Sequence, residues 1–133
     1  MNTDIRWKQR FENFEKAFRQ LNASLRISDP NETELAGIIQ FYEITLELAW
    51  KTLKDFLVLE GFDVKSPREA IKTAFQNGYI SKGEIWIDAL DSRNLSVHTY
   101  DEEMANQLTE NIRNVYYPIL DAFMQWGQQQ KNK

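Results

Sequence analysis

The 133-residue chain has no cysteine and a single histidine, His98. The absence of cysteine excludes disulfides, thiolate nucleophiles, zinc ribbons and iron–sulfur clusters. A lone histidine also excludes any site that needs two imidazoles from one chain. The apolar runs are only a few residues long and the N-terminus carries no signal-peptide pattern. We therefore expect no membrane span and a cytoplasmic protein.

The chain also has no excess of basic residues. The chain has 16 lysines and arginines against 20 aspartates and glutamates, which gives a net charge of −4. A protein that holds long nucleic acid by electrostatics is normally basic. The composition by itself therefore favours an acidic, mostly helical domain that binds a partner.

Glycine and proline are scarce, at 5 and 3 residues, and they fall where helices should begin or end. Apolar residues at spacings of three and four predict an amphipathic helix over residues 3–26. This stripe consists of Trp7, Phe11, Phe14, Phe18, Leu21 and Leu25. A second predicted helix covers residues 30–60, with Asp29 as its cap and Pro30 in its first turn. It is apolar over more than half its circumference, which indicates a central helix, a second interface, or both.

Two shorter helices follow, and each opens with the pattern of a capping box. Ser66 and Glu69 begin the first, which should end at Gly78, and Ser81 and Glu84 begin the second. No segment alternates with the period of a strand.

A last helix is expected to start near Asp101 and to be kinked at Pro118. These elements predict an all-α, up-and-down bundle of about five helices. We expect one domain over residues 1–127 and a polar, frayed tail over residues 128–133.

Chemistry-bearing residues gather between the fourth and fifth predicted helices. Arg93 precedes His98 by five residues, and Tyr100 follows His98 by two. This spacing matches the R-x4-H-x-Y motif of HEPN-domain proteins. The chain resembles in particular the bacterial HEPN-fold nucleotidyltransferase substrate-binding proteins, which implies a HEPN-like fold with a four-helix core. Further matching stretches are Phe41-Tyr42-Glu43 through Leu48-Ala49-Trp50-Lys51, Ser66-Pro67-Arg68-Glu69 with Ala74-Phe75, Gly78-Tyr79-Ile80, and Trp86.

The resemblance implies a partner and an activity. Such proteins form complexes with a minimal nucleotidyltransferase, and in toxin–antitoxin pairs the HEPN member is a metal-independent ribonuclease that acts as a homodimer. Carried over to this chain, Arg93 and His98 are the catalytic pair, Asn94 is a supporting polar residue, and Tyr100 is the residue to which the partner transfers AMP. The resemblance implies no metal or cofactor in this chain, and RNA or a nucleotide as its ligand.

The chemistry of these side chains fits that role. Metal-free RNA cleavage needs a base, an acid and positive charge at the phosphate. His98 suits proton transfer near neutral pH, and the guanidinium of Arg93 matches phosphate oxygens. One chain supplies one imidazole, so an acid–base pair favours a symmetric dimer, unless one group serves both roles. Residues five apart on an unbroken α-helix point about 140° apart. The helix must therefore end between Arg93 and His98, or the two must pair between chains.

Simpler interpretations remain open. His98 could cap a helix or pair with Asp101, and Tyr100 could be an ordinary half-buried aromatic residue. Trp50 and Trp86 are expected in the core or an interface, and Glu47 and Lys51 as a solvated ion pair.

The alternative to a ribonuclease is a non-catalytic subunit that binds a nucleotide or substrate for the transferase. The acidic composition favours this alternative, and the complete motif favours the ribonuclease.

Overall fold

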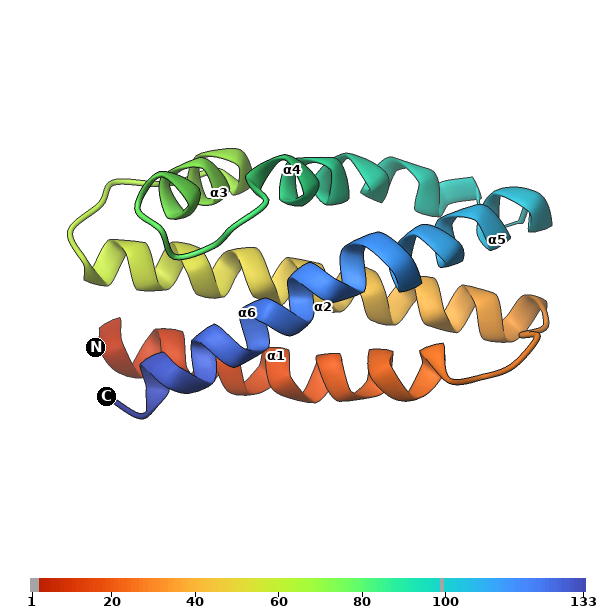
Figure 1. Cartoon of the computed structure of the whole chain (residues 1–133), viewed down its shortest axis with the longest axis horizontal. Helices are drawn as coiled ribbons and strands as arrows, with labels where there is room; N and C mark the ends of the chain where they lie inside the picture. Colours follow the sequence, from red (N-terminus) through yellow and green to blue (C-terminus); the bar gives the residue numbers. More distant parts are fainter. Residues whose placement is uncertain (1–2, 99) are drawn as a thin grey trace.

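The computed structural model describes the backbone of residues 3–98 and 100–133, and their side chains except at positions 3 and 96–98. Over these residues it is helical and contains no strand. The elements are α1 (Thr3–Leu25), α2 (Glu32–Leu59), α3 (Pro67–Gln76), α4 (Gly83–Ser92), the 3₁₀ segment η1 (Arg93–His98), α5 (Glu102–Asn111), the π-helical segment η2 (Ile112–Tyr116) and α6 (Tyr117–Lys131). Because η2 joins α5 to α6 directly, the described chain forms a bundle of five helical rods, which confirms the predicted fold class (Figure 1).

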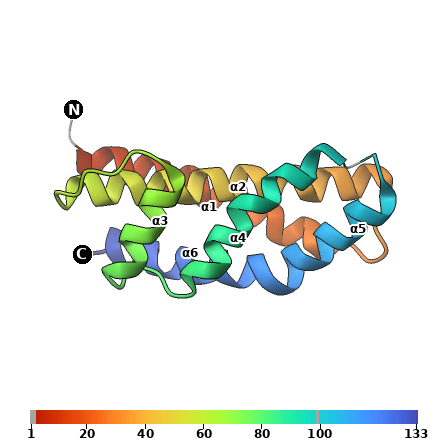
Figure 2. The same ribbon diagram turned by 90° about the horizontal axis from the view of Figure 1, so that it is seen from above.

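Helix α2 is the central element of the bundle. It contacts α1, α3, α5 and α6, and α1 runs beside it in the opposite direction (Figure 1). Helices α3 and α4 lie above α2 in Figure 1, whereas α1 lies below it, and the start of α1 lies at the same end of the bundle as the end of α6 (Figure 2). The wide apolar surface of α2 is explained by these neighbours, since Ile39, Leu46, Trp50 and Leu57 are all buried.

The aromatic stripe of α1 faces the core, as its spacing predicts. Phe11 and Phe14 are fully buried, and Phe14 packs edge-on against Phe123 of α6 with ring centroids 5.0 Å apart. Gly127 of α6 lies against Phe11 so closely that a Cβ at this position would overlap the phenyl ring. The absence of a side chain at Gly127 therefore lets α6 approach α1.

Helix α2 begins two residues later than the sequence suggested. Asn31 is its N-cap: the Asn31 side chain accepts from the Glu34 N–H at 2.8 Å, and the Asn31 N–H donates to Glu34 Oε1 at 2.9 Å. The expected cap, Asp29, instead has a left-handed backbone with φ of 51°. The capping box at Asn31 satisfies two backbone donors at once, which a cap at Asp29 does not achieve.

Only one of the two predicted capping boxes on the shorter helices is present. Ser66 and Glu69 open α3 as expected, and Gly78, with φ of 77°, follows its end. The box predicted at Ser81 is wrong. The N-cap of α4 is Lys82, with φ of 56° and no side-chain hydrogen bond to the helix.

The last rod is distorted where Pro118 was expected to kink it. The chain widens into the π-helical η2 immediately before α6, and Pro118 lies in the first turn of α6. Proline has no N–H to donate to the preceding turn, and a π segment accommodates this interruption. Helix α6 then continues past Gly127 to Lys131, where a frayed tail was expected. At its end, Lys131 Nζ lies 3.4 Å from Glu12 and 3.7 Å from Glu15 of α1.

Candidate functional site

The motif residues lie on the connection between α4 and α5, as the sequence predicted. The α-helix ends at Ser92, and the backbone continues as the 3₁₀ segment η1 from Arg93 to His98. Asp101 then caps α5 by accepting from the N–H groups of Glu103 and Met104 at 3.1 and 3.3 Å. The candidate site is therefore built on a short, tight segment that joins two helices.

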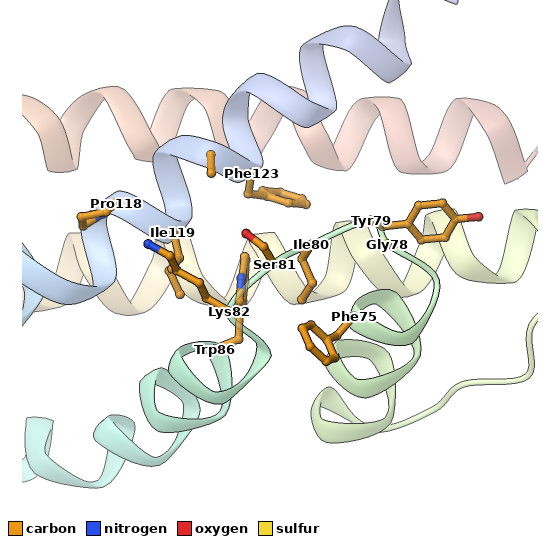
Figure 3. Close-up of a pocket in the computed structure, with 11 residues that line it drawn as sticks. Phe75, Gly78, Tyr79, Ile80, Ser81, Lys82, Trp86, Pro118, Ile119 and Phe123 are labelled. Atoms are coloured by element: carbon orange, nitrogen blue, oxygen red, sulfur yellow. The ribbon is translucent and has the colours of Figure 1, made fainter.

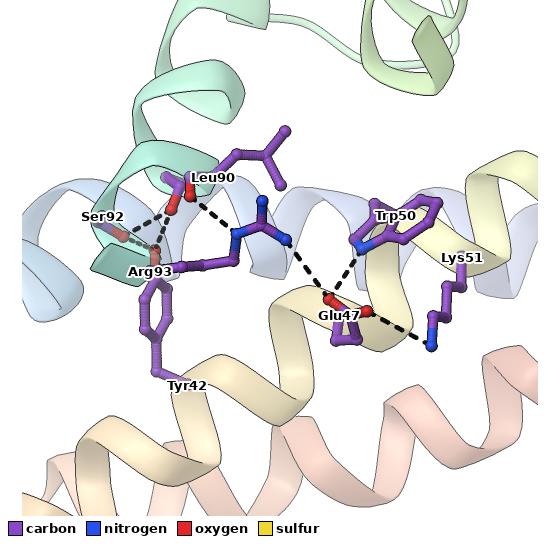
Figure 4. Close-up of polar contacts among 8 residues, drawn as sticks. Tyr42, Glu47, Trp50, Lys51, Leu90, Ser92 and Arg93 are labelled. Carbon is purple, nitrogen blue, oxygen red and sulfur yellow. Dashed lines mark hydrogen bonds and ion pairs between the residues drawn. The ribbon is translucent and has the colours of Figure 1, made fainter. Parts of the chain in front are cut away.

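A buried hydroxyl pair fixes the start of this segment to α2. Tyr42 of α2 is 1% exposed, and its hydroxyl oxygen lies 2.8 Å from Ser92 Oγ. Ser92 Oγ donates to the Ala89 carbonyl at 2.6 Å, so the Tyr42 hydroxyl is the donor to Ser92 when that bond is made. The contact between Tyr42 and Ser92 is drawn in Figure 4. Burial raises the pKa of Tyr42 above its ordinary value, which keeps the hydroxyl protonated as a donor.

Arg93 extends from this anchor toward α2. Its Nε donates to the Leu90 carbonyl at 2.9 Å, and its Nη1 lies 3.8 Å from Glu47 Oε2. The same Glu47 oxygen accepts from Trp50 Nε1 at 2.9 Å, while Lys51 Nζ lies 3.4 Å from Glu47 Oε1 (Figure 4). Glu47 and Lys51 thus form the expected ion pair, and Glu47 also orients Arg93. The Arg93 side chain remains 43% exposed, so it is open to a ligand.

A shallow hollow of about 420 Å³ lies beside Arg93. It is lined by Glu43, Ile44, Glu47, Leu48 and Arg93. Ile44 is 42% exposed, and Leu95 on η1 is 41% exposed. The hollow thus combines one cation, two carboxylates and an apolar surface. This mixture suits contact with another protein surface at least as well as contact with a bare phosphate chain.

The other motif residues differ from Arg93 in their exposure and in how far the structure describes them. Asn94 is exposed on η1 and Tyr100 is 79% exposed, so Tyr100 is not the half-buried residue of the simpler interpretation. The side chain of His98 and the whole of Thr99 lie outside the described residues. The backbone of η1 has about three residues per turn, so positions 93 and 98 are about 120° apart around it. One copy of η1 therefore presents these two positions on different sides.

The acidic residues beside the motif are engaged locally. Asp91 forms an ion pair with Arg68 of α3, and Asp101 is occupied as the cap of α5. Glu102 and Glu103 are exposed in the first turn of α5, where negative charge complements the helix dipole. Two of the carboxylates that argued against an anionic ligand thus have structural roles: Asp91 links α4 to α3, and Asp101 caps α5.

Two contacts of the site were not predicted. Tyr42 is 50 positions from Ser92, and the segments that hold α3 and α4 separate Glu47 from Arg93 in the sequence. Both α2 residues lie in or beside the stretches that carried the family resemblance, and that was the signal available. Trp50 and Trp86 are buried, as expected.

Across the described part of the chain, no group of three His, Asp or Glu side chains is placed to hold a metal ion. None of the described helices is both long and apolar enough to cross a membrane.

Comparison with known proteins gives three findings. The family model described as "Nucleotidyltransferase substrate binding protein like" matches residues 9–129. A protein from Haemophilus influenzae named "Probable ribonuclease HepT" is 30% identical over 79 residues, which is 56% of this chain and 54% of that protein. The match thus spans about half the length of this curated relative.

The third finding is structural. A protein from Thermus thermophilus with a known crystal structure has the same fold, with a TM-score of 0.75 and 28% sequence identity. The match covers 90% of this chain and 99% of that one. The solved structure thus shows the same helical fold, and the family model matches this chain from α1 into α6. The chain belongs to the HEPN-type family of nucleotidyltransferase substrate-binding proteins.

Proposed function

We propose that this chain is the HEPN partner of a minimal nucleotidyltransferase and the toxin half of a toxin–antitoxin pair. In this proposal it cleaves RNA without a metal, through Arg93 and His98, and is silenced when AMP is transferred to Tyr100. The observation that carries the proposal is the Arg93 guanidinium, which is oriented by Leu90 and Glu47 yet 43% exposed. The matched relative named a probable ribonuclease supports the same activity.

In the proposed reaction, the 2′-oxygen of a ribose attacks the adjacent phosphorus and the bond to the 5′-oxygen breaks. An imidazole of His98 removes the proton from the 2′-hydroxyl, and a second imidazole supplies one to the leaving oxygen. Arg93 stabilises the added negative charge on the phosphate oxygens. The enzyme is silenced when the Tyr100 oxygen attacks the α-phosphorus of ATP and diphosphate leaves.

The proposed enzyme is a homodimer, within a larger complex with the transferase. Two facts support the dimer: each chain has one histidine, and positions 93 and 98 face different sides of η1. The exposed Ile44 and Leu95 beside Arg93 provide apolar surface for a second copy. In a symmetric dimer, Arg93 of one copy could then meet His98 of the other.

The test is expression of the chain in a bacterial host with and without its transferase. We expect the chain alone to slow growth and degrade RNA, and both effects to disappear in Arg93→Gln and in His98→Ala. Arg19→Gln is the matched control, because Arg19 is 67% exposed and lies on α1, away from η1. Normal growth with intact RNA would contradict the ribonuclease.

Silencing is tested separately by mass spectrometry. With active transferase and ATP, we expect the chain to gain mass in steps of one AMP, and this gain to be lost in Tyr100→Phe. Tyr79→Phe serves as control, since Tyr79 lies before the start of α4, whereas η1 follows its end. An unmodified chain under these conditions would contradict AMP transfer to Tyr100.

The second candidate is a non-catalytic subunit that binds a nucleotide or substrate for the transferase. It is favoured by Glu43 and Glu47, whose carboxylates line the hollow beside Arg93 and repel a phosphate chain. If RNA stays intact while the chain still forms a complex with the transferase, this candidate replaces the first.

A further inference from the structure

A second cavity lies at the other end of α4 from Arg93. Its volume is about 480 Å³, within the usual range for small-molecule sites. It lies between the α3–α4 loop and α6, and its walls include Phe75, Ile80, Trp86, Ile119 and Phe123 (Figure 3). It shares no lining residue with the hollow around Arg93. A ligand in this cavity would therefore be held by residues other than those that line the hollow at Arg93.

The indole of Trp86 presents an unused hydrogen-bond donor to this cavity. Trp86 is 1% exposed and packs edge-on against Phe123, with ring centroids 5.8 Å apart. Among the described residues, no acceptor contacts its indole N–H, whereas those of Trp7 and Trp50 donate to Asp4 and Glu47. Trp86 Nε1 is not among the described polar atoms that are both fully enclosed and without a partner, so this N–H is accessible to a ligand atom. A ligand with an acceptor atom would supply the one that Trp86 lacks.

The rim of the cavity carries a single charge, the ammonium of Lys82. Lys82 forms no ion pair with any described carboxylate. Its backbone is left-handed, with φ of 56°, a conformation that is costly for a lysine. In Figure 3 its side chain extends from the loop along the cavity toward Ile119, beside the Trp86 ring. The α3–α4 loop thus places the positively charged side chain of Lys82 at the rim of an otherwise apolar cavity.

We propose that this cavity binds a small aromatic acid. The flat apolar body would lie among Phe75, Trp86 and Phe123, an acceptor atom would take the Trp86 N–H, and the anionic group would meet Lys82. Each part of the ligand corresponds to one feature of the site: aromatic walls, an indole donor without an acceptor among the described residues, and a cation without a described carboxylate partner. An aliphatic cation offers no acceptor to the Trp86 N–H and would be repelled by Lys82, and a neutral sugar carries no negative charge for Lys82.

The test follows the indole N–H signal of Trp86 in proton–nitrogen correlation spectra of the full chain. Trp86→Phe identifies that signal by its loss. The probes are 2-naphthoate and its uncharged counterpart, 2-naphthamide. We expect naphthoate to shift the Trp86 signal in a saturable way and to bind about fivefold more tightly than the amide, as one partly exposed charge contact allows.

Variants then locate the binding. Lys82→Gln should weaken naphthoate about fivefold and leave naphthamide within about twofold, whereas Lys72→Gln, on the exposed side of α3, should change neither. Ala122→Trp should abolish binding of both probes, because Ala122 is exposed and lines the cavity, so its larger side chain fills the space without entering the core.

Two results would overturn the proposal. A Trp86 signal that does not move at millimolar naphthoate would mean that the cavity holds water only. Undiminished binding to a folded Ala122→Trp variant, with its fold checked by thermal melting, would place the ligand elsewhere. Neither outcome depends on whether the chain cleaves RNA.

Discussion

Between α1 and α6, aromatic rings pack with almost no exposure, whereas the side chains that the structure describes between Arg93 and Asp101 are exposed at the surface. Phe11 and Phe14 are 0% exposed, while Leu95 and Tyr100 are 41% and 79% exposed. Burial of large apolar side chains supplies most of the stability of a folded chain. The aromatic region therefore holds the bundle, and the connection is left to carry chemistry. Substitutions in the two regions should have effects of different size and kind.

The largest effect is expected at the contact between α1 and α6. Gly127→Ala forces a methyl group into the buried ring of Phe11, so we expect the free energy of unfolding to fall by about 2–3 kcal/mol. Urea denaturation measures this change. Gly37→Ala is the matched control on α2, where a Cβ meets nothing within 4 Å. It should stabilise the chain by about 0.5–1 kcal/mol, as alanine does in a helix. Equal effects at the two glycines would contradict the close packing of α6 on α1.

A smaller effect is expected where the two regions meet. Tyr42→Phe removes the hydroxyl that bonds Ser92 but leaves the ring, which stacks on Tyr116 with centroids 5.6 Å apart. We expect a loss of about 1 kcal/mol in unfolding free energy. Tyr117→Phe is the control, because the Tyr117 hydroxyl has no hydrogen-bond partner among the described residues. If the two variants lose the same stability, the Tyr42–Ser92 bond does not anchor the connection.

The same contrast explains what could be predicted from the sequence. Periodic apolar spacing predicted the buried stripe of α1, because a helix places residues three and four apart on one face. The Ser66–Glu69 box was also read correctly, since its partners are local. The cap of α2 was misplaced because Asp29 and Asn31 both have cap-forming side chains and each has a glutamate three residues later, but only Asn31 forms the box, with Glu34.

The site itself was predictable only in part. The motif located Arg93 and Tyr100 on the connection between helices, but the contacts that orient Arg93 include one from α2. The cavity at Trp86 was not predicted, because it is formed by residues from α3, α4 and α6 that no local spacing relates. Contacts between distant segments depend on how the rods pack, and one sequence by itself does not reveal that.

A third prediction concerns the pH dependence of stability that arises from Asp55, between α1 and α2. Asp55 of α2 lies 3.0 Å from Arg10 of α1, and burial raises the pKa of Asp55 above its ordinary value of 3.8 despite nearby Arg10, Arg6 and Lys54. The carboxyl group of Asp55 therefore binds a proton more tightly in the folded chain than in the unfolded chain. The contribution of protonated Asp55 to stability is fully present below pH 3.8, and it is lost as the pH rises through the pKa that Asp55 has in the folded chain.

The variant Asp55→Asn isolates this group, because it removes the titration and keeps a side chain of the same shape beside Arg10. We expect the wild type to lose stability relative to Asp55→Asn as the pH rises from 3.8 toward neutrality, as measured by urea denaturation at a series of pH values. A difference that stays constant over this range, or grows in the opposite direction, would mean that the ion pair with Arg10 outweighs burial.

The smallest effect on stability is expected at Arg93. Its ion pair with Glu47 is 3.8 Å long and the two side chains are 43% and 40% exposed, and such pairs contribute little. We expect Arg93→Gln to change the unfolding free energy by less than about 0.5 kcal/mol. Arg113→Gln should cost more, about 1 kcal/mol, because the bond from Arg113 to the Leu25 carbonyl at 3.2 Å joins η2 to the end of α1. The bond from Arg93 to the Leu90 carbonyl, in contrast, spans only three residues.

The variants of these two arginines distinguish a residue that supports the fold from a residue that takes part in catalysis. If the ribonuclease proposal holds, Arg93→Gln abolishes RNA cleavage in a chain that unfolds like the wild type, and Arg113→Gln weakens the fold but keeps the activity. RNA fragments and urea denaturation, measured on the same preparations, check both halves. A large loss of stability in Arg93→Gln would show that the connection helps to hold the bundle after all. Loss of cleavage in that variant would then report unfolding rather than the removal of a catalytic group.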